Sequence, residues 1–561
     1  MFSKISFVTA FIDIYKDTPF DNKTIEWRCN KFRDIAAMGF PIIIFVCKNT
    51  LPYIEILKTE FENLYILEVL NMEDTWVYKN SESMNLSLPY HRNMSKDTRE
   101  YMYVINSKAE FLYKAVEANP WNSTHFAWID FSISYIFKEE ERTFEYLNIF
   151  AQRTINDETC LLVPGCWREK ISLTDTDSYI NNVVWRFCGG FLLGDANSIK
   201  KLFELYREHF VAFLNTHKTI VWEVNFWAWL EANDFWTPRW YEADHNDSII
   251  QIPADICCRN LSLSPDLRTT TYEYPAIENF GPGSASYVYF KGEHLLNTRY
   301  INYSILENGC YDIKDPKHII ISRNVFSKLN GNLEPIKFIE MKEINIRLPS
   351  KNCYIYGLED IRLYSVGDTL KFIATNINFS PTGYNRMLIG EYDIIDHTFN
   401  NCIIAKPPYE THCEKNWIPL LKNGKEYFIY KWFPMEIGTL NAENELVIEM
   451  RYPIKSPWFH KVRGSSIFVD NGEHFVGVVH FSEETTPRRY YHMLVSLDKE
   501  TFKPLKYSEI FHFQHLGIEF CIGFTIKNGE YVFWISQMDR EPLMISISID
   551  KLKLMYDFKG V

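Results

Sequence analysis

The first part of the chain alternates apolar runs with amphipathic segments. KISFVTAFI (residues 4–12) and PIIIFVCK (residues 41–48) have the pattern of buried strands, and residues 24–38 between them have a helical period. Farther along, residues 99–120 predict a long helix, and HFAWIDFSI (residues 125–133) predicts the next strand. Two more helices are predicted at residues 197–217 and 219–233. Strands that alternate with helices predict a largely parallel α/β sheet covered on both faces.

The pattern changes between about residues 250 and 285. From Tyr287 onward, short apolar strands are separated by turn residues, and helical periods are scarce. Examples are YVYFKGE, LKFIATNIN, EYFIYKWFP and EYVFWISQMD. Many short strands of this kind predict a sandwich, a barrel or a propeller, of which we favour the propeller.

The length of the chain supports this division. A chain of 561 residues is too long for one ordinary hydrophobic core. We therefore predict an α/β domain at residues 1–255, a linker at residues 256–285 and an all-β domain at residues 286–561.

Composition and charge narrow the classes of protein. The hydrophobic content of 46% and the charged content of 23% are typical of a globular protein. A net charge of −13 without a basic cluster argues against a nucleic-acid partner. Asp13 and Lys16 interrupt the first apolar stretch, so we expect no signal peptide, and no apolar run is long enough to predict a membrane span. The 12 cysteines form no CxxC pairs, which favours reduced thiols and a cytoplasmic location.

Asp130 ends an apolar strand in the first predicted domain. Ligands of open α/β sheets bind at the carboxyl ends of the strands, where a carboxylate can approach a metal-bound diphosphate. Mg²⁺ or Mn²⁺ with a phosphorylated ligand needs only one or two carboxylates from the protein. An aspartate that caps the next helix is the alternative interpretation of the same pattern.

The motifs around Asp130 carry a family resemblance. In chain order they are FVTAFIDIYKD, Arg28, YVINSKAEFL with Tyr103, Asn106 and Lys108, WIDFSI, CGGFLLGD and VWEVNFWAWLE. This series, over roughly residues 5–245, resembles the HtrL/YibB-type proteins, a GT-A-like (Rossmann-like) group of nucleotide-sugar glycosyltransferases. The resemblance implies a glycosyltransferase with the same fold.

The resemblance also implies roles for individual residues. Asp130 would be the metal-proximal acid of an Asp-x-Asp element, although Ser132 stands where the second acid is expected. His245, with Asp244 as the alternative, would be a later ligand of Mn²⁺ or Mg²⁺. Glu223 would act on the acceptor as base or as sugar-hydroxyl ligand. The other expected nucleotide-sugar contacts are Arg28, Lys108, Gly189 and Gly190.

GLEDIRLY in the second predicted domain places two acids and an arginine close together. On a regular strand, Asp360 would share a face with Arg362, and Glu359 would point the other way. A carboxylate beside a guanidinium stays ionised, so an acid role for Asp360 needs desolvation or further carboxylates nearby. A structural Arg–Asp pair is the alternative.

A second resemblance rests on LLNTRYINYSI, IISRN, GLEDIRLY, EKNWIPLL, RGSSIFV, VVHFS and GIEFCIGF. In this order they resemble the five-bladed propellers of the mannoside-phosphorylase type (glycoside hydrolase family 130) and the related mannosyltransferases. The resemblance implies that Asp360, with a raised pKa, protonates the departing glycosidic oxygen, while inorganic phosphate attacks with inversion. The implied phosphate and sugar ligands are Glu359, Arg362, Lys415, Arg463 and His480. EDIR in place of the commoner EDPR indicates that specificity has drifted.

The two resemblances together predict a two-domain carbohydrate-active enzyme. The first domain would transfer a hexose from a nucleotide-sugar donor to a glycan or glycoconjugate acceptor. The second would perform another glycosyl transfer or an inverting phosphorolysis of a mannose-like sugar, with inorganic phosphate or a sugar-1-phosphate. A single-activity glycosyltransferase with a glycan-binding propeller is the alternative, and a scaffold with two degenerate sites is a third hypothesis. The expected place is the cytoplasm of a bacterium, or the host cytoplasm if the protein is viral.

Overall fold

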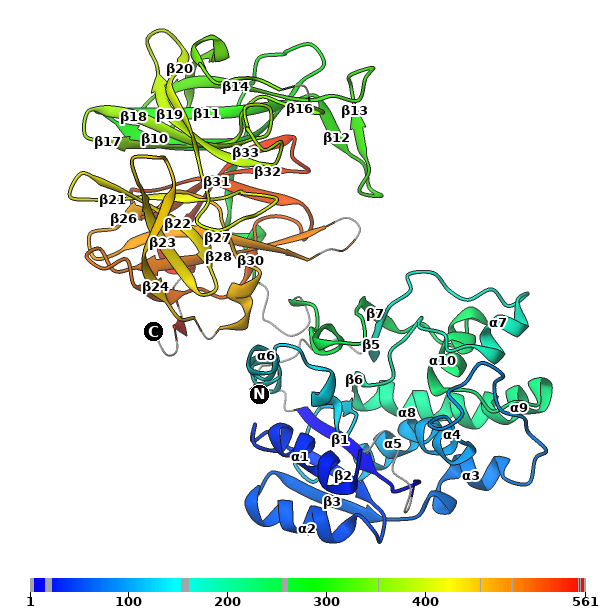
Figure 1. Ribbon diagram of the computed structural model, residues 1–561. Helices are drawn as coiled ribbons and strands as arrows, with labels where there is room; N and C mark the ends of the chain where they lie inside the picture. The colour runs from blue at the N-terminus through cyan, green and yellow to red at the C-terminus, as the bar shows by residue number, and fades with distance from the viewer. Residues whose placement is uncertain are drawn as a thin grey trace. The chain divides into compact units, whose positions relative to one another are not determined.

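The chain folds into two compact units, Met1–Arg259 (unit 1) and Asn260–Val561 (unit 2). The computed structural model (Figure 1) describes residues 5–15, 23–152, 161–254, 261–351, 353–454, 456–483, 485, 488–552, 554 and 556–558. The predicted linker, residues 256–285, lies mostly in unit 2. Its described part includes two short strands and the start of a long one, so it contributes to the sheets of that unit.

Unit 1 contains one mixed sheet. Its strand order is β3-β2-β1-β4-β6-β5-β7. The strands are β1 Ile5–Phe11, β2 Ile42–Val46, β3 Leu64–Val69, β4 His125–Ile129, β5 Leu161–Gly165, β6 Phe191–Asp195 and β7 Arg239–Glu242. Strand β6 runs antiparallel to both β4 and β5, whereas the other neighbouring strands pair in parallel. The predicted parallel α/β sheet is therefore present with one reversed strand.

The helices of unit 1 lie around this sheet (Figure 1). They are α1 Ile25–Ala36, α2 Leu51–Glu60, α3 Trp76–Ser81, α4 Arg99–Asn106, α5 Lys108–Ala118, α6 Glu140–Gln152, α7 Thr176–Asn181, α8 Ala196–Leu205, α9 Val211–His217 and α10 Glu223–Ala232. The long helix predicted at residues 99–120 is divided at Ser107 into α4 and α5. The helix predicted at residues 197–217 contains a π-helical turn at Tyr206–Phe210 between α8 and α9. Fully buried apolar residues in β1, β2 and β4 join the helices in one core.

Unit 2 is built of short strands. They are β8 Leu261–Ser262, β9 Arg268–Thr270, β10 Gly281–Phe290, β11 Glu293–Ile301, β12 Tyr303–Ile305, β13 Tyr311–Ile313, β14 Ile320–Leu329, β15 Pro335–Glu340, β16 Ile355–Tyr356, β17 Glu359–Val366, β18 Thr369–Asn376, β19 Arg386–Asp393, β20 Thr398–Ala405, β21 Ile418–Lys422, β22 Lys425–Trp432, β23 Met435–Leu440, β24 Leu446–Tyr452, β25 Arg463–Gly464, β26 Val469–Asp470, β27 Phe475–Glu483, β28 Arg489–Leu497, β29 Pro504–Tyr507, β30 Phe511–His512, β31 Glu519–Lys527, β32 Glu530–Gln537, β33 Glu541–Ser548 and β34 Tyr556–Asp557. Apart from short 3₁₀ turns, the elements described in this unit are all strands. The described strands pair antiparallel except for β14 with β16 and β30 with β8.

The strands of unit 2 form a propeller-like arrangement. Four sheets follow a four-strand path, namely β10-β11-β14-β15, β17-β18-β19-β20, β21-β22-β23-β24 and β31-β32-β33-β9. In the last of these, β9 from the start of the unit pairs with β33 from its end, which ties the two ends of the unit together. The remaining large sheet contains eight strands, including β25, β27 and β28. The prediction of five like blades is therefore wrong in its count, because only four of the described sheets repeat the pattern.

Within the described residues, we find no helix that is both long enough and apolar enough to cross a membrane.

Candidate functional sites

A cavity of about 570 Å³ opens in unit 1 outside the carboxyl ends of β1 and β4. The chain proceeds from β1 to β2 and β3 on one side of the sheet, and returns on the other side at β4. The loops after β1 and β4 therefore diverge, and such a switch point is where open α/β sheets bind ligands. The segments that follow these two strands, residues 12–15 and 130–136, both line the cavity.

Asp130 is the first residue after β4 and lines this cavity. Its side chain is 46% exposed, whereas every residue of β4 is buried. The indole Nε1 of Trp128 donates a hydrogen bond of 2.7 Å to Asp130 Oδ1, which fixes the position of the carboxylate. Phe131, which follows, stacks on Phe11 and Phe32 at ring distances of 4.2 and 4.3 Å. The apolar neighbours thus hold the loop to the core and leave Asp130 at the opening.

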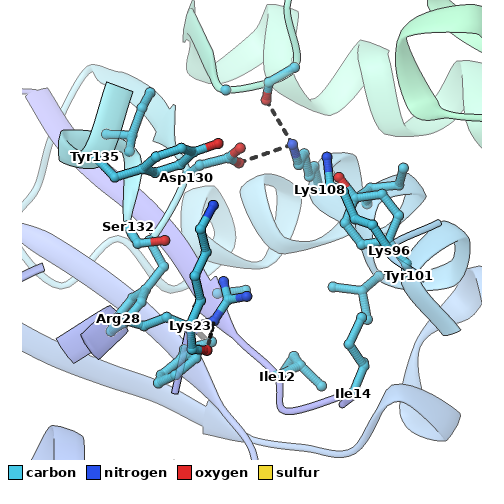
Figure 2. A pocket seen from close by; sticks show the side chains of 18 of the residues that line it. Ile12, Ile14, Lys23, Arg28, Lys96, Tyr101, Lys108, Asp130, Ser132 and Tyr135 are labelled. Carbon is cyan, nitrogen blue, oxygen red and sulfur yellow. Dashed lines mark hydrogen bonds and ion pairs between the residues drawn. The ribbon is translucent and has the colours of Figure 1, made fainter. Parts of the chain in front are cut away.

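Lys108 is the buried cation of the cavity (Figure 2). Its ammonium lies 3.0 Å from Asp130 Oδ1 and donates to Glu223 Oε1 at 2.8 Å and to the carbonyl of Gly189 at 2.7 Å. Burial disfavours the charged ammonium, but the Asp130 and Glu223 carboxylates outweigh this and raise the pKa of Lys108. Because three acceptors occupy its three N–H groups, Lys108 has no donor left for a phosphate, and it organises the site instead.

Replacing Lys108 with methionine is expected to lower the free energy of unfolding of unit 1 by about 3–5 kcal/mol, because two carboxylates lose their shared cation. Urea denaturation measures the change. Lys114→Met is the matched control, since Lys114 on the same helix also bridges two carboxylates, Glu68 and Glu110, but is 30% exposed. The control is expected to cost about 1 kcal/mol or less. Equal losses in the two variants would contradict a structural role for the buried ammonium.

Glu223 and Gly189 both contact Lys108, and Gly190 lies beside Asp130. The side chain of Glu223, at the start of α10, is only 7% exposed. A Cβ atom on Gly189 would lie 2.1 Å from Glu223 Oε1, so only glycine leaves room for this carboxylate. A Cβ on Gly190 would face Asp130 Oδ2 at 3.7 Å. The structure therefore brings together Asp130, Lys108, Glu223 and both glycines, which the sequence separates widely.

Other basic and aromatic side chains line the cavity around Asp130. Arg28 does so from α1, and its Nε donates to the carbonyl of Lys23 at 3.2 Å. The ammonium of Lys23 lies 4.1 Å from the centre of the Tyr135 ring. Sequence reasoning identified Arg28 but did not identify several other lining residues, among them Lys23, Lys96 and Tyr135. Lys23 directly precedes the N-cap of α1, and Tyr135 follows Asp130 in the sequence. Their positions beside recognised elements are the sequence signal that could have identified both residues.

The metal prediction has a partial physical basis. Asp130 and His245 line the same cavity. Burial is the largest of the effects that lower the pKa of His245, which favours the neutral imidazole that binds metals. Within the described part of the chain, no three His, Cys, Asp or Glu side chains gather as a metal cluster. The donors therefore do not fit a site built by protein alone, but they fit a divalent cation that takes its other ligands from a diphosphate and water.

A second cluster of charges lies in unit 2, and Arg299 of β11 is at its centre. Its guanidinium donates to Asp360 Oδ1 at 2.9 Å and lies 3.5 Å from Glu359 Oε2. Lys415 also approaches Glu359 Oε2, at 3.5 Å. Although burial opposes the charge, these carboxylates raise the pKa of Arg299. Asp360 and Glu359 thus share a cation that the sequence analysis did not assign, although Arg299 stands in the quoted LLNTRYINYSI segment.

Asp539 is a further carboxylate of this cluster that sequence reasoning missed. It accepts a hydrogen bond of 3.0 Å from the Tyr303 hydroxyl. Burial raises the pKa of Asp539, and the nearby positive charge of Arg299 opposes the rise. Asp539 sits in the turn between β32 and β33, so no strand pattern marks it. The structure thereby supplies the additional carboxylate that an acid role in this region requires.

The Arg–Asp pair considered as the alternative for Asp360 does not form with Arg362, and the regular strand on which the two side chains would share a face is interrupted. The ladder between β17 and β18 is irregular between Glu359 and Arg362, and Asp360 has a left-handed φ of 51°. Arg362 is fully buried and donates to the carbonyls of Asp360, Ser465 and Gly464. Its guanidinium therefore holds the backbone and cannot bind phosphate. The bulge turned the side chain of Asp360 toward Arg299 instead.

His480, another predicted cation of unit 2, does not carry a positive charge. It is buried, and its Nδ1 lies 2.8 Å from Ser465 Oγ. Burial, with the neighbouring positive groups, lowers the pKa of His480 well below its usual value, so the ring is neutral and provides no charge for phosphate. Lys415 stays charged beside Glu359, which is the main cause of its raised pKa. Arg463 is exposed and pairs with His480 across the β25–β27 ladder.

Comparison with known proteins gives one sequence match and several structural ones. Residues 3–220 match the model of a family described as bacterial protein of unknown function (HtrL_YibB). No curated protein matches the sequence. The HtrL/YibB resemblance of unit 1 is thus confirmed at the level of the family model, which spans less than half of the chain.

Among solved structures, similar chains include β-1,2-mannobiose phosphorylase from Listeria innocua, with 14% identity over 50% of this chain and 93% of that one, at a TM-score of 0.35. A mannose phosphorylase from Leishmania mexicana in complex with phosphate shares 12% identity over 53% and 93%, also at 0.35. A GDP-Man-dependent mannosyltransferase from the same organism shares 11% identity over 52% and 94%, again at 0.35. TM-scores at this level do not assign an activity to this chain.

Proposed function

We propose that unit 1 is a GT-A-like glycosyltransferase that binds a nucleotide-sugar donor in the Asp130 cavity. The observation that carries the proposal is the half-exposed Asp130 at the switch point of the sheet, facing a cavity of about 570 Å³ that basic side chains also line. A donor of this class needs a volume of this order. It also needs positive charge for its diphosphate, and Lys23, Arg28 and Lys96 lie on the cavity wall.

The residues of the cavity would have different roles in the transfer. Acceptor oxygen attacks the anomeric carbon, and the bond from that carbon to the diphosphate oxygen breaks, so negative charge accumulates on the diphosphate. Arg28, Lys23 and Lys96 would stabilise this leaving group electrostatically. A divalent cation bound at Asp130 would neutralise the diphosphate further. Lys108 fixes Asp130 and Glu223 relative to each other, and Glu223 would accept the proton or orient the acceptor hydroxyl.

The test is donor turnover by the full-length protein. A panel of nucleotide sugars is supplied with Mn²⁺, with Mg²⁺ or with a chelator, and the release of nucleoside diphosphate is followed. We expect release from one donor class, faster with a glycan acceptor present. If no donor is consumed and none protects the protein against thermal unfolding, a degenerate scaffold explains unit 1 better.

For unit 2 we propose a second glycosyl-transfer or phosphorolysis site at Asp360, acting on a mannose-like sugar. The specific observation is that Asp360 shares one buried cation, Arg299, with Glu359, while Asp539 provides another carboxylate close by. Mutual repulsion among carboxylates helps one of them keep a proton, as a general acid requires. Lys415 and Arg463 are the predicted cations that remain for phosphate.

Replacing Asp360 with asparagine is expected to lower a phosphate-dependent sugar-1-phosphate release by about 100-fold or more, because a general acid contributes roughly this much. The donor turnover of unit 1 should stay unchanged. Asp368→Asn, a 96% exposed aspartate of the same unit, is the control. If Asp360→Asn leaves every turnover intact but abolishes glycan binding, unit 2 is a non-catalytic binding module.

A further inference from the structure

Two cysteines meet directly beside the Asp130 cavity. Cys166 follows β5 and Cys188 precedes Gly189, and their Sγ atoms lie 3.6 Å apart. The backbones around them are hydrogen-bonded: the Cys166 amide donates to the carbonyl of Trp185 at 2.9 Å, and the Cys188 amide donates to that of Pro164 at 2.7 Å. Two thiols are thus held in contact by paired backbone segments.

The two thiols differ in their access to solvent. Cys188 has no exposed surface, whereas Cys166 is half-buried. A small oxidant can therefore reach Cys166 first, and Cys188 is the thiol next to it. An accessible cysteine with a resolving cysteine in contact is the arrangement of reversible thiol oxidation.

We propose that Cys166 and Cys188 form a reversible disulfide with hydrogen peroxide as the oxidant, and that this disulfide modulates the Asp130 cavity. Cys166 sulfur attacks peroxide, the O–O bond breaks, and a sulfenic acid and water form. Cys188 sulfur then attacks the Cys166 sulfur, the S–O bond breaks, and a second water leaves. Two thiols are oxidised and one peroxide is reduced to two waters; a dithiol reductant reverses the change.

A short series of contacts connects the two cysteines to the Asp130 cavity. Forming the bond brings the sulfur atoms from 3.6 Å to roughly 2.05 Å. Cys188 is joined to Gly189, whose carbonyl accepts from Lys108 at 2.7 Å, and Lys108 holds Asp130 and Glu223. On the other side, Cys166 Sγ lies 4.0 Å from Asp244, the neighbour of His245. A shift of either thiol therefore moves the groups that carry the proposed function.

The test uses full-length protein treated with hydrogen peroxide, then alkylated, digested and analysed by mass spectrometry. We expect one cross-linked peptide pair containing Cys166 and Cys188, absent from Cys166→Ser and removed by dithiothreitol. Cys310→Ser, which removes an exposed cysteine of unit 2, should keep the cross-link. The proposal would be overturned if, after oxidation, Cys166 and Cys188 are recovered as alkylated cysteines without a cross-link. It would also be overturned if Cys166 is recovered as sulfenic or sulfinic acid without the disulfide.

The effect on the cavity rests on the proposed function of unit 1 and is measured separately. Oxidation is expected to lower donor turnover by about tenfold or more, since small displacements of catalytic groups have effects of this size. Dithiothreitol should restore turnover, and Cys166→Ser should resist the oxidant. If the cross-link forms without a change in turnover, the modulation is refuted. If the reduced protein has no turnover at all, the proposed function fails, while the peptide map still decides the disulfide.

Discussion

Replacing Asp130 with asparagine is expected to lower the turnover of a nucleotide-sugar donor by about 100-fold or more, because removing one group that stabilises charge in a transition state lowers rates by about this factor. The amide keeps the shape of the side chain and can still accept from Trp128 Nε1. It loses the negative charge that a divalent cation and the Lys108 ammonium both require. Steady-state kinetics of nucleoside diphosphate release measures the loss.

The structure also offers a matched control for Asp130. Asp234 has a side chain that is 84% exposed and pairs only at the surface with Lys170. Asp234→Asn should therefore keep the turnover of the wild type. Since Asp130→Asn also weakens the ion pair with Lys108, its thermal unfolding must be recorded beside its kinetics. Full activity in a folded Asp130→Asn protein would remove Asp130 from the catalytic machinery.

Replacing Arg299 with methionine is expected to destabilise unit 2 by about 3–5 kcal/mol at neutral pH, because a buried cation is removed from between carboxylates. Asp360 loses its ion-pair partner, Glu359 keeps only Lys415, and Asp539 loses the effect that opposes its raised pKa. Without Arg299, the pKa of Asp539, which burial already raises, rises further above that of the unfolded chain. The folded variant then binds protons more tightly, so its stability falls as the pH rises from about 4 toward neutrality and is partly regained on acidification.

Urea denaturation at pH 5 and pH 8 measures this effect. Arg323→Met is the control, since Arg323 is 42% exposed and lies 3.6 Å from Glu340 at the surface. This variant should lose about 1 kcal/mol or less, with little dependence on pH. If Arg299→Met is equally destabilised at both pH values, its cost comes from lost packing rather than from the uncompensated carboxylates.

In unit 1, the sequence predicted the sheet and the place of Asp130 because both depend on local pattern. The apolar run before Asp130 has the composition of a buried strand, and its carboxyl end follows directly. The reversal of β6 was not predictable, since CGGFLLGD is apolar whichever way the strand runs. The role of Lys108 was also hidden, because its three acceptors come from distant parts of the chain.

In unit 2, the sequence predicted short strands and singled out Asp360 as a candidate, but it did not indicate the partner of this carboxylate. The face assigned to Asp360 assumed the regular alternation of a strand, and a bulge with a left-handed residue broke that alternation. Arg299 and Asp539 are far from Asp360 in the chain, so only the packing of the sheets brings their charges together. His480 looked like a cation in the sequence because burial, which keeps it neutral, is invisible there.

The most direct test of the central claim is hydrogen exchange on the full-length protein with and without a nucleoside diphosphate and Mn²⁺. The claim is that the nucleotide binds outside β1 and β4, where residues 12–15 and 130–136 line the cavity. The account predicts slower exchange of backbone amides in both segments, and no slowing when Asp130 is replaced with asparagine. Protection confined to unit 2, or no protection anywhere at saturating nucleotide, would contradict it.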